Sequence, residues 1–329
     1  MKDKFIILKP YGNVDWEGPT FSHLAEIRNP RCLTEEELIR EIQDVHLLIA
    51  DVDIKVTAKV LGAAKQLRAV VCAATGIDFL DASDATRRGI LVTNLPDYCV
   101  EAVAEHTFAL IFCLCRHIVP GSKAAREGNW DIRRLFQGIE VEGKTLGIIG
   151  LGRIGRRVAE KADGLGIKIA FYDPYVSQES LKEKSYEKKE SLVNLLRDSD
   201  FVSIHVVLAS ETTRMFGEKE FRQMKPTAYF LNVARGGIVD EDALCRALKE
   251  GWIAGAAVDV LAKEPPDKDH PLFHLENIII TPHIAYNTKE AKEKARNQLK
   301  EIILSLIHGQ YPINVVNPEV RERWERPAL

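Results

Sequence analysis

The sequence predicts an α/β protein with two doubly wound parallel sheets, each in its own domain. Three observations support this prediction. The chain has 329 residues, which is enough for two domains with cores of their own. Short apolar runs alternate with helical patterns along most of the chain, as expected for parallel strands joined by crossover helices. The alternation is interrupted once, just after residue 100, which places a domain boundary there.

The first hundred residues predict buried strands at 46–50, 69–74 and 90–94. The stretches TEEELIREIQ and TAKVLGAAKQL lie between these runs and have the helical period. Residues 100–118 then predict one long apolar helix without a break, followed by a polar, loop-like segment that reaches the next apolar run.

A second alternation follows and predicts a nucleotide-binding (Rossmann) domain. The charged stretch 181–190 is expected to be a solvated face, 288–309 a last helix, and the tail INVVNPEV a return to the first domain. The domains are therefore residues 1–99 with 287–329, and residues 100–286. Six strands with crossover helices are what such a domain requires, and they are expected at 145–150, 168–173, 200–206, 228–233, 255–260 and 277–283.

Composition excludes several classes of function. The formal net charge of −3 offers no basic stripe for nucleic acid or for an anionic membrane. The start of the chain lacks the apolar core of a signal peptide, and no run approaches the ~18 apolar residues of a membrane span. The six cysteines have no metal-ligand spacing, so no metal site is expected. These features predict a cytoplasmic protein.

The stretch GIIGLGRIG places Gly150, Gly152 and Gly155 at G-x-G-x-x-G spacing. The spacing alone is weak evidence, but a buried strand precedes it and a helical pattern follows. The three glycines would allow a tight turn, backbone approach to a pyrophosphate, and close helix–strand packing. The next strand ends in Asp173, whose carboxylate can accept ribose hydroxyls and would repel a 2′-phosphate; the alternative is a cap or turn residue. The order and spacing predict a dinucleotide site that favours NAD over NADP.

Three further residues follow strands of the same domain: Arg235, Glu264 and His283. The carboxyl ends of strands bind ligands in open α/β sheets. Taken singly, each has an ordinary structural explanation as a surface arginine, a solvated acid or a loop histidine. Beside a dinucleotide site they form a coherent acid–base set.

The motifs GKTLGIIGLGRIG, FYDPY, LNVARGGIVDEDAL, AAVDV…EPP and TPHIA occur in the order seen in the D-isomer-specific 2-hydroxyacid dehydrogenases. The chain resembles this family over essentially its whole length. The resemblance implies a flavodoxin-like substrate domain and a Rossmann NAD domain with a cleft between them, and a homodimer formed through the NAD domain. It makes Arg235, Glu264 and His283 catalytic. It implies NAD contacts, beyond the three glycines, from Arg153, Ile154, Asp173, Val206, Thr212, Val233, Ala234 and Asp259.

Each catalytic role has a physical reason. The guanidinium of Arg235 matches the carboxylate and carbonyl oxygens of a 2-oxo acid. Protonated His283 gives its proton to the carbonyl oxygen while NADH delivers hydride to C2. Glu264 would orient the imidazole and keep it protonated.

The substrate is expected to be a small 2-oxo acid of the pyruvate, glyoxylate or hydroxypyruvate type. The resemblance implies that amides near Thr75 and Gly76 hold the substrate carboxylate. Asp51 occupies the position where related phosphoglycerate enzymes carry an arginine for substrate phosphate, which disfavours a phosphorylated substrate. Tyr98 and Tyr286 are expected to line the pocket, with ordinary packing as the alternative.

Two other functions stay open. One is a phosphoglycerate dehydrogenase-like enzyme. The other is an NAD-sensing dimeric scaffold like the C-terminal-binding corepressors, which resemble the chain in the same motifs.

Overall fold

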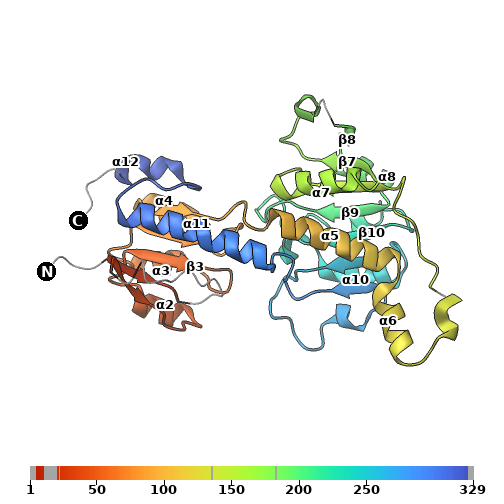
Figure 1. The fold of residues 1–329 in the computed structure, drawn as a ribbon, viewed down its shortest axis with the longest axis horizontal. Coiled ribbons are helices and arrows are strands. Elements are labelled where there is room, and N and C mark those ends of the chain that lie inside the picture. The colour runs from red at the N-terminus through yellow and green to blue at the C-terminus, as the bar shows by residue number, and fades with distance from the viewer. Residues whose placement is uncertain (1–4, 11–20, 22, 135, 182–183, 325–329) are drawn as a thin grey trace. The chain divides into compact units, whose positions relative to one another are not determined.

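The computed structural model describes residues 5–10, 21, 23–134, 136–181 and 184–324. The chain divides into two compact units. Unit 1 comprises Met1–Cys99 and Thr288–Leu329, and unit 2 comprises Val100–Asn287. Each unit contains one parallel sheet with helices, so the predicted α/β class with two parallel sheets is confirmed (Figure 1).

Unit 1 has a five-stranded sheet in the order β2-β1-β3-β4-β5, which is the flavodoxin-like order. Its strands are β1 (Phe5–Leu8), β2 (Ala25–Arg28), β3 (Leu47–Ala50), β4 (Ala69–Cys72) and β5 (Leu91–Thr93). Its helices are α2 (Glu35–Glu41), α3 (Ala58–Ala63), α4 (Ala82–Arg88), α11 (Lys289–Ile307) and α12 (Arg321–Trp324). The sequence predicted β3 to β5 and the last helix, but not the short strands β1 and β2.

Local sequence fixes where the helices of unit 1 begin and end. Thr34 and Glu37 form a capping box at the start of α2, and Thr57 caps α3. Gly89 ends α4 in the left-handed conformation, with φ of 73°. The C-terminal tail is joined to β5: the Val316 N–H donates to the Val92 carbonyl at 2.8 Å. Buried Asn317 accepts a hydrogen bond from the Val92 N–H at 2.8 Å.

Unit 2 has a seven-stranded parallel sheet in the order β12-β11-β10-β9-β6-β7-β8. This is the Rossmann order extended by one strand beside the sixth. The strands are β6 (Thr145–Ile149), β7 (Lys168–Tyr172), β8 (Tyr186–Lys188), β9 (Phe201–Ile204), β10 (Tyr229–Asn232), β11 (Gly255–Val258) and β12 (Ile278–Ile280). The helices are α5 (Val100–Cys115), α6 (Ile118–Arg126), α7 (Arg153–Asp163), α8 (Leu192–Asp198), α9 (Glu218–Phe221) and α10 (Glu241–Lys249).

Two expectations about unit 2 were wrong. The stretch 181–190 is not only a solvated face, because β8 lies within it and Tyr186 is buried; residues 182–183 lie outside the described residues. The helix expected over 100–118 ends at Cys115, and α6 begins at Ile118 after His117 adopts a φ of 49°. Pro120 explains the break, since its ring would clash with the Arg116 carbonyl in a continuous helix but fits the first turn of a new one.

No single helix in the described part of the chain is long and apolar enough to cross a membrane. The bent pair of α5 and α6, at 60°, meets that test by length and composition only. Much of α5 is buried inside the protein.

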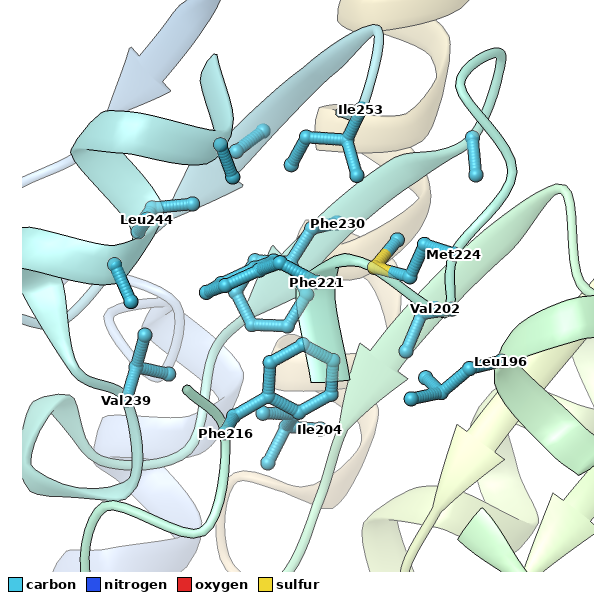
Figure 2. Packing of buried hydrophobic residues seen from close by; sticks show 14 of the residues in the cluster. Leu196, Val202, Ile204, Phe216, Phe221, Met224, Phe230, Val239, Leu244 and Ile253 are labelled. Atoms are coloured by element: carbon cyan, nitrogen blue, oxygen red, sulfur yellow. The ribbon is translucent and has the colours of Figure 1, made fainter. Parts of the chain in front are cut away.

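A cluster of buried side chains supports the middle of the unit 2 sheet (Figure 2). Phe216, Phe221 and Phe230 lie at its centre, with ring centroids 4.7–5.2 Å apart. Leu196, Val202 and Ile204 pack around them in the same cluster. Edge-to-face aromatic contacts add directional preference to the apolar burial. The cluster therefore fixes the positions of β9 and β10 and of the loops that follow them.

Candidate active site

The loop between β6 and α7 needs glycine at two positions for steric reasons. Gly150 has a φ of 89°, a conformation that disfavours a side chain. A Cβ on Gly155 would lie 2.1 Å from the Gly150 carbonyl oxygen, so α7 packs directly against the loop. A Cβ on Gly152 would meet nothing within 4 Å. Gly152 is the N-cap of α7, where free N–H groups and the helix dipole favour an anion. The loop has the shape that a pyrophosphate group requires.

Asp173 follows β7 directly and is half-buried. One of its carboxylate oxygens accepts a hydrogen bond from the Leu151 N–H at 2.8 Å, and the other accepts one from the Tyr175 N–H at 2.8 Å. The carboxylate is thus fixed against the glycine loop. A carboxylate has about four acceptor sites, so oxygens with one partner each can still accept ribose hydroxyls.

The other expected cofactor residues of this group lie at the carboxyl edge of the unit 2 sheet. Val206 follows β9, and its side chain would be 2.6 Å from a Cβ on Gly150. The Thr212 hydroxyl donates to the Val207 carbonyl at 2.6 Å and stabilises the loop after β9. The edge also includes Arg153 and Ile154 in the first turn of α7, and Val233 and Ala234 after β10.

Arg235 lies in a turn that buried Asn232 stabilises from both sides. The Asn232 side chain accepts a hydrogen bond from the Ala234 N–H at 3.1 Å and donates to the Arg235 carbonyl at 2.9 Å. A Cβ on Gly236 would lie 1.9 Å from the Leu261 carbonyl carbon. The absence of a side chain at Gly236 therefore lets the loop that carries Glu264 approach the Arg235 turn.

Glu264 and His283 form a direct hydrogen bond. The Nδ1 atom of His283 lies 2.7 Å from Oε2 of Glu264, whose Oε1 accepts a hydrogen bond from the Leu261 N–H at 2.8 Å. Burial pushes the pKa of Glu264 upward. The hydrogen bonds from His283 and Leu261 and the positive charges of His283 and Arg235 outweigh burial, so the pKa is lowered. The carboxylate is therefore ionised at neutral pH, and Nδ1 is the nitrogen that faces it.

The backbone around His283 is held by Asp259, which is 1% exposed. The His283 N–H donates to the Asp259 carbonyl at 2.7 Å. The Ile284 and Ala285 N–H groups donate to the two carboxylate oxygens, at 2.9 and 2.8 Å. His283 itself has a left-handed φ of 51°. Tyr286 lies edge-on to the His283 ring, with centroids 6.0 Å apart.

The expected substrate residues of unit 1 lie after β3, β4 and β5. The Ala73 N–H donates to the Ala50 carbonyl at 2.7 Å, so the chain segments that enter Asp51 and Thr75 run side by side. The Thr75 hydroxyl donates to the Leu95 carbonyl at 2.9 Å. Gly76 is half-buried in the same loop, and Tyr98 is 9% exposed.

Several residues that shape the site received no role from the sequence. Asn232 and Gly236 border Arg235, and their signal was the NVARGG motif itself. His106 and Thr281 contact Asp259, and no pattern in the sequence marked them. In the described part of the chain, no group of three or more His, Cys, Asp or Glu side chains could hold a metal ion.

Comparisons with known proteins agree with this geometry. Residues 108–285, more than half of the chain, match the NAD-binding domain of the D-isomer specific 2-hydroxyacid dehydrogenases. The chain belongs to this family. It is therefore an oxidoreductase that acts on the CH–OH group of its substrates, and unit 2 carries the NAD-binding domain. The glycine loop and Asp173 fit that cofactor.

Individual relatives differ in the activity that their names give. A glyoxylate reductase of Korarchaeum cryptofilum is 40% identical over 290 residues, which cover 87% of each chain. A D-3-phosphoglycerate dehydrogenase of Methanocaldococcus jannaschii is 40% identical over 294 residues, which cover 89% of this chain and 56% of that relative. Among solved structures, a D-lactate dehydrogenase of Aquifex aeolicus complexed with NAD and lactic acid is 29% identical, with a TM-score of 0.85 and coverage of 98% of this chain and 100% of that one.

The Asp173 carboxylate predicts a preference for NADH over NADPH of about tenfold or more in kcat/KM, because it would lie beside a 2′-phosphate of like charge. Asp173→Asn removes the charge and should narrow the preference. Asp163→Asn, at the opposite end of α7, makes the same change in net charge and serves as the control. Equal kcat/KM for the two cofactors in the wild-type enzyme would contradict this assignment.

Proposed function

We propose that the protein is an NAD-dependent D-2-hydroxyacid dehydrogenase that interconverts a small 2-oxo acid and its 2-hydroxy acid. The observation that carries this proposal is the 2.7 Å hydrogen bond between Glu264 and His283, with the charge of Arg235 close enough to lower the pKa of Glu264. Bound NADH supplies the hydride for C2 of the substrate. The protein supplies the proton, the cation and the orientation.

His283 serves as the acid in reduction and as the base in oxidation. Its Nδ1 faces Glu264, which leaves Nε2 as the nitrogen for the substrate oxygen. The ionised Glu264 favours the protonated ring and fixes its plane. The positions of the proton and of the ring are thus both determined by one carboxylate.

Arg235 binds the substrate carboxylate and polarises the carbonyl. A guanidinium offers parallel N–H donors that match adjacent oxygens of a 2-oxo acid. The Asn232 hydrogen bonds fix the backbone on both sides of the turn. We further propose that the amides of Thr75 and Gly76 contact the same carboxylate, and that Tyr98 and Tyr286 border the pocket.

Glyoxylate, hydroxypyruvate and pyruvate are the favoured substrates. The names of several relatives support glyoxylate, at about 40% identity. A phosphorylated substrate is the second candidate, because other relatives are named phosphoglycerate dehydrogenases. Asp51 argues against it, since a carboxylate near the substrate loop would repel a phosphate.

A homodimer formed through unit 2 is part of the proposal. Large apolar side chains are exposed on α5, α6 and the segment after them: Phe112, Ile118, Val119 and Trp130. Figure 1 shows α6 and the following short helix at the margin of unit 2. We propose that these exposed apolar side chains contribute to the association surface.

A panel of 2-oxo acids with NADH tests the proposed function directly. We expect turnover of at least one small acid, and we expect His283→Ala to lower kcat by ~10²–10⁴-fold, the usual scale for a lost general acid. His274→Ala changes an exposed histidine of the same unit and should leave kcat unchanged. A wild-type protein that binds NADH but reduces none of the acids would support the scaffold alternative instead.

Glu264→Gln should move the pH profile of reduction. Reduction needs the protonated imidazole, so activity falls as pH rises. Without the carboxylate the protonated ring loses its hydrogen-bond acceptor, and the high-pH limb of kcat/KM should move to lower pH. The matched control is Glu276→Gln, an exposed acid of the same unit. An unchanged limb in Glu264→Gln would show that Glu264 does not support the proton on His283.

Asp51 predicts that hydroxypyruvate is reduced better than phosphohydroxypyruvate. If the Asp51 carboxylate and a substrate phosphate lay about 4 Å apart, their repulsion would cost on the order of 4 kcal/mol at an effective dielectric of ~20. Exposure of the two groups to solvent would reduce this cost. Asp51→Arg should narrow or reverse the preference, and higher salt should weaken it. Glu301→Arg, exposed on α11, makes the same charge change and should not alter the ratio. A wild-type preference for the phosphorylated acid would overturn this prediction.

A further inference from the structure

A histidine from α5 reaches the group that holds the His283 backbone. The Nε2 atom of His106 lies 3.1 Å from the Thr281 hydroxyl oxygen and 3.6 Å from Oδ1 of Asp259. The Thr281 hydroxyl lies 2.5 Å from the same Oδ1. The three side chains come from α5, the end of β11 and the segment after β12, and they meet in one chain of contacts.

The direction of each hydrogen bond follows from the available protons. The Asp259 carboxylate can only accept, so the single Thr281 proton is donated to it. The Thr281 oxygen is then the acceptor for His106, and the proton of that contact lies on His106 Nε2. His106 therefore donates to Thr281, and Thr281 donates to Asp259.

Asp259 in turn fixes three successive backbone N–H groups. Those of His283, Ile284 and Ala285 donate to its carbonyl oxygen and to its two carboxylate oxygens. The two N–H groups after His283 therefore converge on the carboxylate, as in the anion-binding nests that backbone forms around a left-handed residue. His283 supplies that residue, with a φ of 51°. A non-glycine residue in this conformation is maintained only when its surroundings fix it.

The side chains of His106 and Thr281 thus act on the position of His283 through Asp259. Oδ1 receives the Thr281 proton and the Ile284 N–H together. If the Thr281 bond is lost, the carboxylate is free to rotate away from the geometry that the nest requires. The His283 ring would then shift relative to Glu264, although neither residue has been changed.

We propose that His106 and Thr281 are positioning residues that fix the Asp259 carboxylate and, through it, the imidazole of His283. This inference rests on the proposed role of His283 as the acid of the reaction. Neither residue touches the reacting atoms in this proposal. Their contribution is the orientation of the ring that does.

The proposal is tested with four variants of the full chain. Thr281→Val removes the hydroxyl at nearly constant shape, and Thr281→Ser restores it. His106→Leu removes the donor, and His106→Gln places an amide donor near the position of Nε2. Thr107→Val is the matched control, because its buried hydroxyl donates to the Val103 carbonyl within α5 itself.

The first readout is steady-state reduction of the best substrate of the oxo-acid panel. We expect Thr281→Val and His106→Leu to lower kcat by roughly tenfold to a hundredfold, the scale of a misplaced catalytic group. KM for the oxo acid should change by less than about threefold, because Arg235 lies outside the network. Thr281→Ser and His106→Gln should recover most of the loss. The double variant should lose little more than either single variant, since the two act in one chain.

The second readout does not depend on activity. The ring ¹⁵N shifts of His283, assigned with His283→Asn, report which nitrogen carries the proton. In wild type the Nδ1 shift should show a proton on Nδ1, facing Glu264. In Thr281→Val and His106→Leu the Nδ1 and Nε2 shifts should move toward each other, as expected when the proton exchanges between the two nitrogens. In Thr107→Val they should stay as in wild type. Wild-type shifts together with wild-type kcat in both variants would overturn the proposal. If either variant unfolds, its conservative partner and the remaining variant still decide the result.

The two readouts also separate this inference from the proposed function. A wild-type protein without turnover would contradict the proposed function, while the ring shifts would still test the positioning. A loss of kcat in Thr107→Val equal to that in Thr281→Val would show a general effect of α5 packing and would contradict the positioning role.

Discussion

The hydrogen bonds that Asp259 accepts from three successive N–H groups are the constraint on which the geometry of the candidate site depends. They bring the backbone of His283 to the end of β11 and require its left-handed conformation. Once that backbone is fixed, the ring meets Glu264 at 2.7 Å. A buried carboxylate is costly unless its oxygens are satisfied, and here the same bonds that satisfy it also fix the site.

Close backbone approach is the second constraint, and it explains the glycines. Gly155 lets α7 lie against the Gly150 carbonyl, and Gly236 lets the Leu261 segment reach the Arg235 turn. In both places an added Cβ would lie within about 2 Å of backbone atoms, which cannot move aside as a flexible side chain would. The loop between β6 and α7 and the loops that carry Arg235 and Glu264 can therefore form only because these positions are glycine. The aromatic cluster around Phe230 fixes the strands beneath them.

The sequence predicted the parts of the structure that leave a periodic or regularly spaced pattern of residues. Apolar runs and glycine spacing predicted most strands of unit 2, the α7 turn and the acid at position 173. It failed where a short segment is defined by its neighbours: β8 lies in a charged stretch, and its place is set by pairing with β7 and by the burial of Tyr186. The break at His117 was missed because apolar periodicity continues through it, whereas Pro120 decides it sterically.

In the candidate site, too, the sequence predicted the residues that belong to a regular pattern and missed those that depend on neighbours in space. Arg235, Glu264 and His283 could be predicted as candidates because each follows a strand, and Glu264 and His283 do form a hydrogen bond. Thr281 and His106 could not, because their proposed contribution depends on the direction of hydrogen bonds between segments 175 residues apart. No pattern in the sequence encodes that contact.

The most direct measurement is a crystal structure of the complex with NADH and oxamate, an unreactive analogue of a 2-oxo acid. His283 Nε2 should lie about 2.6–3.2 Å from the analogue's carbonyl oxygen, with Arg235 on its carboxylate. An analogue bound with neither residue in contact, or with His283 turned away from Glu264, would contradict the assignment of His283 as the proton donor.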